Sequence, residues 1–203
     1  MTELSVGARP HIEQRLDQTL GLCLLLAAAT TLGGMFGLLL VWGGRVMPAW
    51  AISTTLLVAS LALAIARARV RRHQAPDAGE QGPVRRRSGP WVALAVATGI
   101  CSAAGGMGDF VFDAKYTVLQ PGGPGFCQAA VKETSFLFAG SGELYAVEFG
   151  GLGRAVSSWA ADDGYEPVAS GSYDFEWTDE GALLSLYGGA DPVWPGSHSF
   201  DCR

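Results

Sequence analysis

The residues that come closest to a catalytic pattern lie at the end of the chain, around His198. Ser197, Ser199 and Asp201 flank this histidine, and a serine, a histidine and an acid are the parts of a nucleophilic triad. Successive side chains of a β-strand point to opposite faces, so a strand here would turn His198 away from the other three. We therefore interpret His198 as a surface or edge histidine, and the sequence predicts no catalytic residue.

A metal site has a weaker basis in the sequence. Asp162, Asp163 and Glu166 carry carboxylates, which are the ligands that Ca²⁺ prefers. Their spacing does not match a calcium-binding loop, so they predict a turn. Zinc needs nitrogen or sulfur ligands, and His198 is the only histidine after residue 108. We expect no metal ion and no cofactor.

Paired carboxylates can act as the acid and the base of a glycosidase. Residues 109–203 contain fourteen acids, so such pairs arise by chance and carry little weight. The pairs considered are Glu143 with Glu148 and Asp174 with Glu176. The run 150–154, Gly-Gly-Leu-Gly-Arg, lacks the Lys-Ser/Thr ending of a phosphate-binding loop and predicts a turn.

Cys127 and Cys202 are the only cysteines after residue 108. If this part of the chain lies outside the cytoplasm, the two thiols are expected to form a disulfide, which persists in an oxidising compartment. On the chain-entropy model, closing a loop of about 75 residues stabilises a fold by roughly 4 kcal/mol. The alternative is two free thiols. Cys23 and Cys101 fall in apolar runs, where a thiol fills space as a small apolar group.

Charge is divided unevenly along the chain. Residues 1–108 contain ten arginines and five acids, whereas residues 109–203 contain two lysines, two arginines and fourteen acids. Such asymmetry indicates two different environments. The acidic half argues against a nucleic acid partner, because phosphate binding needs Lys or Arg. The excess of arginine over lysine, with abundant Ala and Gly, is typical of a GC-rich bacterial genome.

Three runs without ionisable side chains predict three transmembrane α-helices, at 20–42, 49–66 and 90–108. At about 1.5 Å per residue, each run is long enough to cross a hydrocarbon core of about 30 Å. Residues 43–48 would join the first two helices as a short outer loop. The runs place no ionisable group at membrane depth, which argues against an ion or proton pathway. Gly33 and Gly37 form a Gly-x-x-x-Gly pair that predicts close helix packing.

The placement of arginine predicts the orientation. Nine arginines lie in 1–19 and 67–89, against one in 43–48, and arginine-rich segments stay on the cytoplasmic side. We therefore expect a multi-pass protein of the bacterial cell membrane, with the N-terminal tail 1–19 and the basic loop 67–89 cytoplasmic and residues 109–203 extracellular. An alternative is that the run after Arg85 acts as a signal peptide, cleaved beyond the small residues 102–104.

Residues 109–203 predict an all-β domain, an antiparallel sandwich or barrel. Short alternating runs separated by Gly, Pro and Asp predict six to eight strands. The segment 128–138 is predicted as a long strand followed by a turn at 139–142, and 173–177 with 182–187 is predicted as a hairpin. Aromatic residues exceed what so small a core needs, which is a hint of a binding face.

The stretch 125–138, Gly-Phe-Cys-Gln-Ala-Ala-Val-Lys-Glu-Thr-Ser-Phe-Leu-Phe, is followed by related runs at 142–147 and 159–165. Together they resemble segments of small uncharacterised actinobacterial membrane-anchored or secreted proteins with a Cys-containing β-rich domain. The resemblance implies no activity and no site residue.

The sequence thus favours a membrane-anchored extracytoplasmic binding or interaction domain, with the lipid bilayer and a protein at the outer domain as expected partners. This hypothesis predicts an aromatic or acidic surface patch without a deep polar cleft. Two alternatives stay open. An extracytoplasmic hydrolase with an unrecognised site predicts a pocket in which His198 or carboxylates converge. An accessory subunit of a membrane complex is a variant of the binding hypothesis.

Overall fold

The structure, a computed structural model, describes residues 9–74 and 89–202. It divides into two compact units that interleave along the chain. One unit comprises the chain up to Leu32 together with Trp50–Ala103, and the other comprises Gly33–Ala49 together with the chain from Ala104 onward. The first unit is helical, and the second consists mainly of β-strands.

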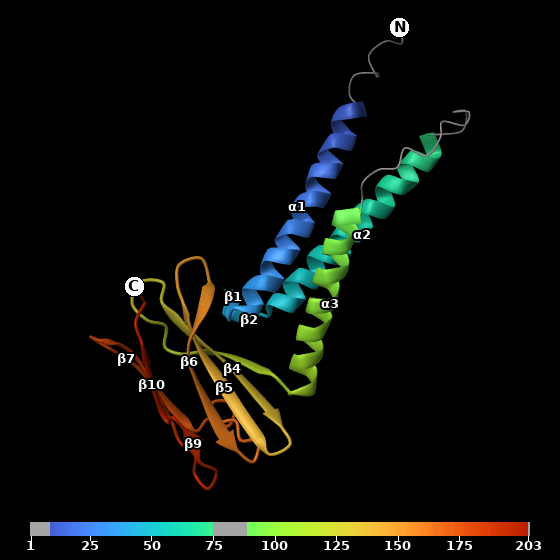
Figure 1. The fold of residues 1–203 in the computed structure, drawn as a ribbon. Helices are drawn as coiled ribbons and strands as arrows, with labels where there is room; N and C mark the ends of the chain where they lie inside the picture. The colour runs from blue at the N-terminus through green and yellow to red at the C-terminus, as the bar shows by residue number, and fades with distance from the viewer. Residues whose placement is uncertain (1–8, 75–88, 203) are drawn as a thin grey trace. The chain divides into compact units, whose positions relative to one another are not determined.

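Three helices carry the apolar runs, α1 (Arg9–Met35), α2 (Ala49–Gln74) and α3 (Gly89–Val111), as Figure 1 shows. The segments long and apolar enough to cross a bilayer are Arg15–Met35, Ala49–Arg69 and Gly89–Val111. The three predicted helices are therefore present, and their lengths and compositions suit membrane spans.

The first predicted span, 20–42, extends too far at its C-terminal end. Helix α1 ends at Met35, and Leu38–Trp42 forms strand β1. Gly37 adopts a φ of +70°, a left-handed conformation that ends a helix, and its carbonyl accepts a hydrogen bond from the amide of Ala155 at 3.0 Å. The interpretation of Gly33 and Gly37 as a helix-packing pair is therefore wrong for Gly37.

Hydroxyl groups join the three helices of the first unit. The hydroxyl oxygen of Ser102 in α3 lies 2.6 Å from that of Ser53 in α2 and 3.3 Å from that of Thr31 in α1, and all three side chains are buried. Thr55 and Ser60 donate to carbonyls one turn earlier in α2. Three hydroxyl residues of the second apolar run, Ser53, Thr55 and Ser60, are thus hydrogen-bonded within or between the helices.

The second unit is an antiparallel sandwich in which the larger sheet curls into a nearly closed barrel. The larger sheet has the order β2-β1-β6-β5-β4-β3 with β9 beside β6, and the smaller sheet has the order β10-β8-β7. The strands of the larger sheet are β1 (Leu38–Trp42), β2 (Arg45–Met47), β3 (Lys115–Leu119), β4 (Gln128–Phe136), β5 (Ala139–Val147), β6 (Leu152–Asp162) and β9 (Val193–Trp194). Those of the smaller sheet are β7 (Tyr173–Thr178), β8 (Gly181–Leu186) and β10 (Ser197–Phe200).

The predicted sandwich or barrel and the predicted hairpin β7–β8 are confirmed. The predicted outer loop 43–48 is instead the turn and second strand of a β-hairpin. Strand β1 pairs with β6, from Leu38 opposite Arg154 to Leu40 opposite Leu152. The chain between the first two helices therefore contributes two strands to the same sheet as the C-terminal half of the sequence.

The two faces of the larger sheet bury different cores. One face packs through Leu119, Val131 and Leu144 on the smaller sheet, which contributes Leu184 among others. On the opposite face, which we call the concave face, buried Leu39, Val41, Ala130, Tyr145 and Val147 form a second cluster. Val46 of β2 and Val118 of β3 pack against that cluster. Because β2 and β3 are the two ends of the sheet and lie beside each other, the sheet nearly closes around the concave face.

The predicted turn at 139–142 lies inside strand β5, and the chain turns earlier, at Leu137 and Phe138. The glycines that suggested a turn serve packing instead. A Cβ at Gly142 would overlap the indole of Trp159, and a Cβ at Gly140 would overlap the backbone of Tyr165. Glycine is needed at these positions because another part of the chain approaches the strand closely.

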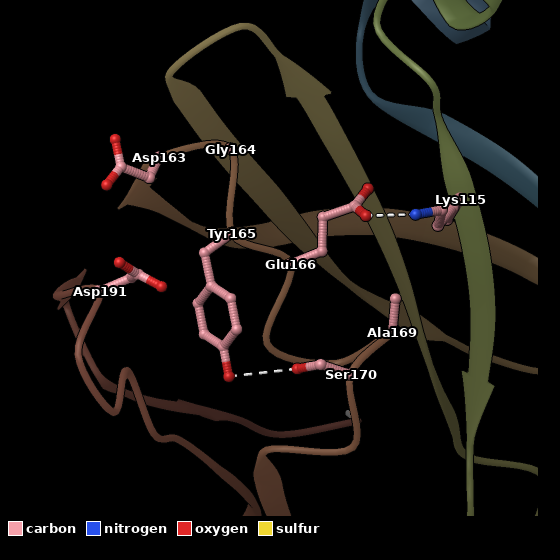
Figure 2. A pocket seen from close by; sticks show the side chains of 8 residues that line it. All are labelled: Lys115, Asp163, Gly164, Tyr165, Glu166, Ala169, Ser170 and Asp191. Carbon is pink, nitrogen blue, oxygen red and sulfur yellow. Dashed lines mark hydrogen bonds and ion pairs between the residues drawn. The ribbon is translucent and has the colours of Figure 1, made fainter.

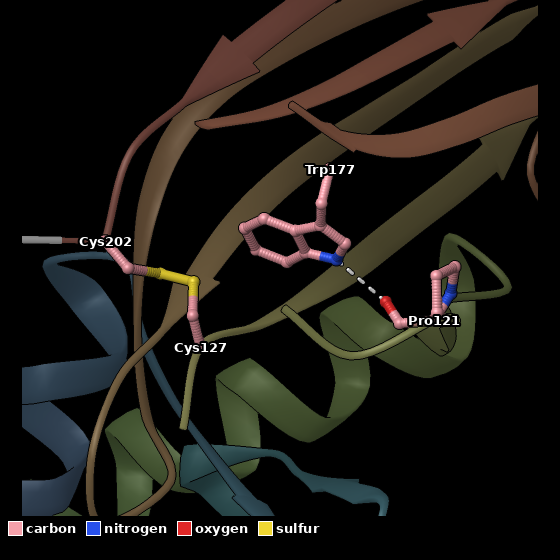
Figure 3. The surroundings of a disulfide bond; sticks show 4 residues. All are labelled: Pro121, Cys127, Trp177 and Cys202. Atoms are coloured by element: carbon pink, nitrogen blue, oxygen red, sulfur yellow. Dashed lines mark hydrogen bonds between the residues drawn. A yellow bond between two sulfur atoms is a disulfide. The ribbon is translucent and has the colours of Figure 1, made fainter. Parts of the chain in front are cut away.

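Cys127 and Cys202 are joined by the expected disulfide, with 6.0 Å between their Cα atoms. Figure 3 shows the bridge beside Trp177, whose indole N–H donates to the carbonyl of Pro121 at 2.9 Å. The Trp177 ring also packs edge-on against Phe200 with 5.7 Å between centroids. The bridge thus fixes the end of β10 to the segment that leads into β4.

Candidate functional site

A polar cavity of about 320 Å³, which we call the mouth cavity, opens in the second unit. Its lining residues are Lys132, Thr134, Ser141, Gly142, Glu143, Ser158 and Trp159. The register places Lys132 of β4 opposite Glu143 of β5, and Glu143 opposite Ser158 of β6. Because strand side chains alternate between faces, these three side chains share the concave face with Tyr145.

The charge of Lys132 is offset inside the same unit. Asp109, in the last turns of α3, lies 2.7 Å from the Lys132 ammonium and accepts a hydrogen bond from the Tyr116 hydroxyl at 2.8 Å. The Lys132 ammonium also lies 5.6 Å from the centre of the Tyr116 ring, a distance suited to a cation–π contact. Lys132 is therefore held in place and neutralised.

Glu143 is the exposed charge at the mouth cavity. It accepts a hydrogen bond from the hydroxyl of Tyr145, which is buried beneath it. Burial, together with the hydrogen bond to a carboxylate, raises the pKa of Tyr145, and the same two causes raise the pKa of Tyr116. Both phenols consequently stay protonated and act as fixed donors at neutral pH.

Hydroxyl groups complete the rim of the mouth cavity. The hydroxyl oxygens of Thr134 and Ser141 lie 2.8 Å apart across β4 and β5, and Ser158 is exposed beside Glu143. The cavity therefore offers one carboxylate and several hydroxyls, which suits the binding of a small polar group that carries a positive charge.

A second cavity, of about 390 Å³, lies between β3 and the segment after β6. Figure 2 shows Lys115 pointing to Glu166, Tyr165 pointing to Ser170, and the carboxylates of Asp163 and Asp191 on the opposite side. Hydrogen bonding to Glu166 raises the pKa of Lys115. Glu166 forms a hydrogen-bonded ion pair with Lys115. The predicted turn at 162–166 is therefore not arranged as a calcium loop.

Glu133 fixes the segment that forms one wall of this second cavity. Its side chain is almost fully buried and accepts hydrogen bonds from the amides of Val168 and Ala169 at 2.8 and 2.7 Å. Burial raises the pKa of Glu133, although the two amides act in the opposite direction. The carboxylate caps the short turn that carries Ser170, so its role is structural.

The exposed aromatic residue Phe126 lines a third cavity, of about 260 Å³, between the β1–β2 turn and the β5–β6 turn. Phe126 and Phe149 are 72% and 80% exposed and pack edge-on with 5.3 Å between their centroids. The two rings thus form an exposed aromatic pair on the surface of the β unit.

The structure corrects the prediction of a surface histidine. His198 is only 3% exposed. Its Nδ1 lies 2.7 Å from the hydroxyl of Ser157, and its Nε2 lies 2.9 Å from the carbonyl of Pro195. Burial lowers the pKa of His198, so the neutral ring bridges the two sheets between Ser157 and the Trp159 ring.

The burial pattern of β10 turns Ser197 and Ser199 outward and His198 inward, as the triad argument expected. His198 lines none of the three cavities described above. The carboxylates of Glu143 and Glu148, one of the two pairs considered for a glycosidase, line different cavities, the mouth cavity and the third cavity. Among residues 9–74 and 89–202, no group of three or more His, Cys, Asp or Glu side chains is placed to hold a metal ion.

The mouth cavity is not predicted by the sequence. The predicted third span ends at residue 108, whereas helix α3 continues to Val111 and carries Asp109. Strand β4 alternates buried Val131 and Glu133 with half-buried Lys132 and Thr134, and the charge of Glu133 conceals this alternation in the sequence. The residues of the mouth cavity come together on the concave face because the larger sheet curls, and the sequence does not indicate that curl.

No protein-family model, no curated protein and no solved structure matches this chain.

Proposed function

We propose that this chain is a membrane-anchored binding module whose β unit, held outside the cytoplasm, takes a ligand at the mouth cavity. The helices α1, α2 and α3 would span the bilayer, with the N-terminus and the basic loop 67–89 in the cytoplasm. The arginine distribution supports this orientation, and the disulfide between Cys127 and Cys202 supports an oxidising compartment for the β unit.

Strand pairing supports the same arrangement. The β1–β2 hairpin follows the first helix, and β6 follows the third, so in a chain with three spans both emerge on one side of the bilayer. The antiparallel pairing of β1 with β6 requires them to share a compartment. An odd number of spans between the hairpin and β6 would separate them.

The observation that carries the proposed binding function is the arrangement of Glu143. Lys132 is neutralised by Asp109, so the carboxylate of Glu143 is the charge that the mouth cavity presents to a ligand. The hydroxyls of Thr134, Ser141 and Ser158 surround it. A primary ammonium group beside a hydroxyl fits this set, because the ammonium donates three hydrogen bonds.

The test uses the full chain in phospholipid nanodiscs and ethanolamine as the probe, since it is a minimal ammonium with a hydroxyl. Ethanolamine is expected to shift the ring resonances of Tyr145 in a saturable way, because Tyr145 donates to Glu143. Glu143→Gln should abolish the shift by removing the charge. Glu148→Gln, an exposed glutamate on another cavity, is the matched control and should leave the shift unchanged.

An equal response in Glu143→Gln and the unchanged chain would contradict the proposal, as would a response that never saturates. Ethylammonium without the hydroxyl should bind more weakly, which checks the contribution of the hydroxyl rim.

The exposed pair Phe126 and Phe149 favours a second candidate, an accessory subunit that contacts a protein. Exposed aromatics are enriched where proteins bind each other. A photo-crosslinking residue placed at Phe149 in native membranes should then yield a specific adduct, whereas the same residue at Asp179, on the β7–β8 turn, should not. Recovery of no adduct at Phe149 would count against this candidate.

A further inference from the structure

The turn between β4 and β5 exposes three consecutive apolar side chains, which we call the apolar tip: Phe136, Leu137 and Phe138. Leu137 is 74% and Phe138 is 78% exposed. Leu137 also has a φ of +52°, a conformation that glycine or asparagine adopts with less strain. An exposed leucine lowers solubility, and its left-handed backbone conformation is unfavourable. We therefore attribute the leucine at this position to a contact that the apolar tip makes with another surface.

The apolar tip is fixed to the end of helix α3, within one compact unit. The amide of Ser135 donates to the carbonyl of Phe112 at 2.8 Å, and the Phe112 and Phe136 rings pack edge-on with 5.2 Å between centroids. The contacts of Asp109 with Lys132 of β4 and with Tyr116 of β3 hold these two strands to the last turns of α3. The tip therefore cannot move far from the point where α3 ends.

The end of α3 is itself apolar and exposed. Met107, Phe110 and Val111 present their side chains to the surroundings, and Phe110 is 83% exposed. The bilayer-spanning candidate in α3 runs to Val111. A helix end with exposed aromatic and aliphatic side chains is typical of the membrane interface, where Phe and Leu enter the acyl boundary and aromatic rings gather.

We propose that the apolar tip inserts into the outer interface of the bilayer that holds α3, as a second contact of the β unit with the membrane. This inference rests on the membrane placement proposed above and is independent of the ligand at the mouth cavity. The tip and the end of α3 then form one anchoring surface, which fixes the orientation of the β unit at the membrane.

Two features favour a lipid surface as the occupant. The tip is a convex turn of three apolar residues, whereas a stable protein interface buries about 1,200–2,000 Å² in total. The apolar surface also ends abruptly, because the next residues toward the sheet on the concave face, Thr134 and Ser141, are polar and hydrogen-bonded to each other. An apolar turn bordered by polar residues matches the boundary between acyl chains and headgroups.

The experiment places single nitroxide labels in the full chain, reconstituted in phosphatidylcholine vesicles, with Cys23→Ser and Cys101→Ser as background so that the disulfide is kept. The label is attached at Phe138→Cys and, as the control, at Asp179→Cys on the exposed β7–β8 turn. Collision with oxygen, which partitions into lipid, is compared with collision with a water-soluble nickel chelate. We expect oxygen to dominate at position 138 and nickel to dominate at position 179.

Adding Leu137→Asn to the Phe138→Cys chain supplies a second measurement. Asparagine suits the left-handed turn but removes apolar surface, so the turn should stay folded while the ratio of oxygen to nickel collisions at position 138 falls. A ratio unchanged by Leu137→Asn would contradict the proposed insertion.

Nickel collision at position 138 equal to that at position 179 would overturn the proposal, because the tip would then lie in water. A label shielded from both reagents would also overturn it, in favour of a protein contact or a second copy of the chain. A label at Val96→Cys, exposed in the middle of α3, separates this failure from a failure of the membrane placement, since it should collide with oxygen in either case if α3 spans the bilayer.

Discussion

His198 links the two sheets as a neutral ring. Burial lowers its pKa below 6.5, the ordinary value for histidine, because the charged ring would lose its water. The unfolded chain therefore binds a proton more readily between the depressed pKa and 6.5. The stability that depends on the neutral ring is complete above 6.5 and is lost as the pH falls through this window.

We predict that an NMR titration of the His198 ring gives a pKa below 6.5, with the signal assigned by its absence in His198→Gln. Ser157→Ala removes the hydroxyl at Nδ1 but leaves the ring buried, so the pKa should remain depressed. A pKa of 6.5 or above in the folded chain would show that the ring is hydrated and would contradict its burial.

Glu133 is the second residue whose role is structural. Glu133→Ala would leave the buried amide of Val168 and that of Ala169 without acceptors, and each unsatisfied buried group costs about 1–3 kcal/mol. We predict a loss of this order in the free energy of unfolding of the β unit, measured by denaturant unfolding of the solubilised full chain. Glu148→Ala, at an exposed turn, should stay within about 0.5 kcal/mol; an equal loss in both variants would contradict the capping role.

Gly142 shows how a single strand position controls the packing of the two sheets. Gly142→Ala adds a Cβ that would overlap the Trp159 indole, and overpacking of a core costs about 1–3 kcal/mol. We predict a loss of that size in the same unfolding measurement. At Gly122 a Cβ meets nothing within 4 Å, so Gly122→Ala is the matched control, and similar losses in the two variants would show that the overlap relaxes.

Gly142 and nearby Gly140 also show why the turn predicted at 139–142 is wrong. Gly140 and Gly142 indicated a turn because glycine and serine cluster there, but the need for small residues arises from Trp159 and Tyr165, which are distant in sequence. Conversely, the apolar run 136–138 predicts the end of a strand, because β-strands are rich in apolar residues, although the chain turns there. The strands β7 and β8 were predicted correctly because alternation and a polar turn coincide there, and local signals suffice.

The predicted end of the first span at residue 42 is wrong for a related reason. Hydropathy cannot distinguish the last residues of a span from a strand whose side chains fill a β core. Strand β1 is apolar because Leu39 and Val41 pack with Tyr145 and Val147, contacts that no local window of sequence contains. The mouth cavity was beyond the sequence for the same reason, since it depends on the curl of the whole sheet.

At the scale of the molecule, the disulfide closes most of the β unit. Cys127 and Cys202 are 75 residues apart, and a loop of that length stabilises the folded state by roughly 4 kcal/mol on the chain-entropy model. We predict that Cys127→Ser with Cys202→Ser lowers the free energy of unfolding of the β unit by about that amount. The unchanged chain under reducing conditions should match the double variant, and a difference between them would assign the loss to the serines instead.

The interleaving of the two units makes a stronger prediction, because the β unit is not the contiguous segment 109–203. That segment lacks β1 and β2, so the edge of β6 that pairs with Leu38–Leu40 would be open. The concave core would lose Leu39, Val41 and Val46, and an open, apolar strand edge is prone to aggregate. Cleavage after residues 102–104, the alternative suggested by the sequence, would release this incomplete sheet.

We therefore predict that a fragment of residues 109–203, secreted on its own, aggregates or is degraded. The same fragment preceded by residues 37–48 on a flexible glycine–serine linker should fold. In the second fragment the amide of Ala155, which donates to the carbonyl of Gly37, should be protected from hydrogen exchange. A soluble and protected 109–203 fragment would contradict the shared sheet and would make cleavage of the third helix compatible with a folded product.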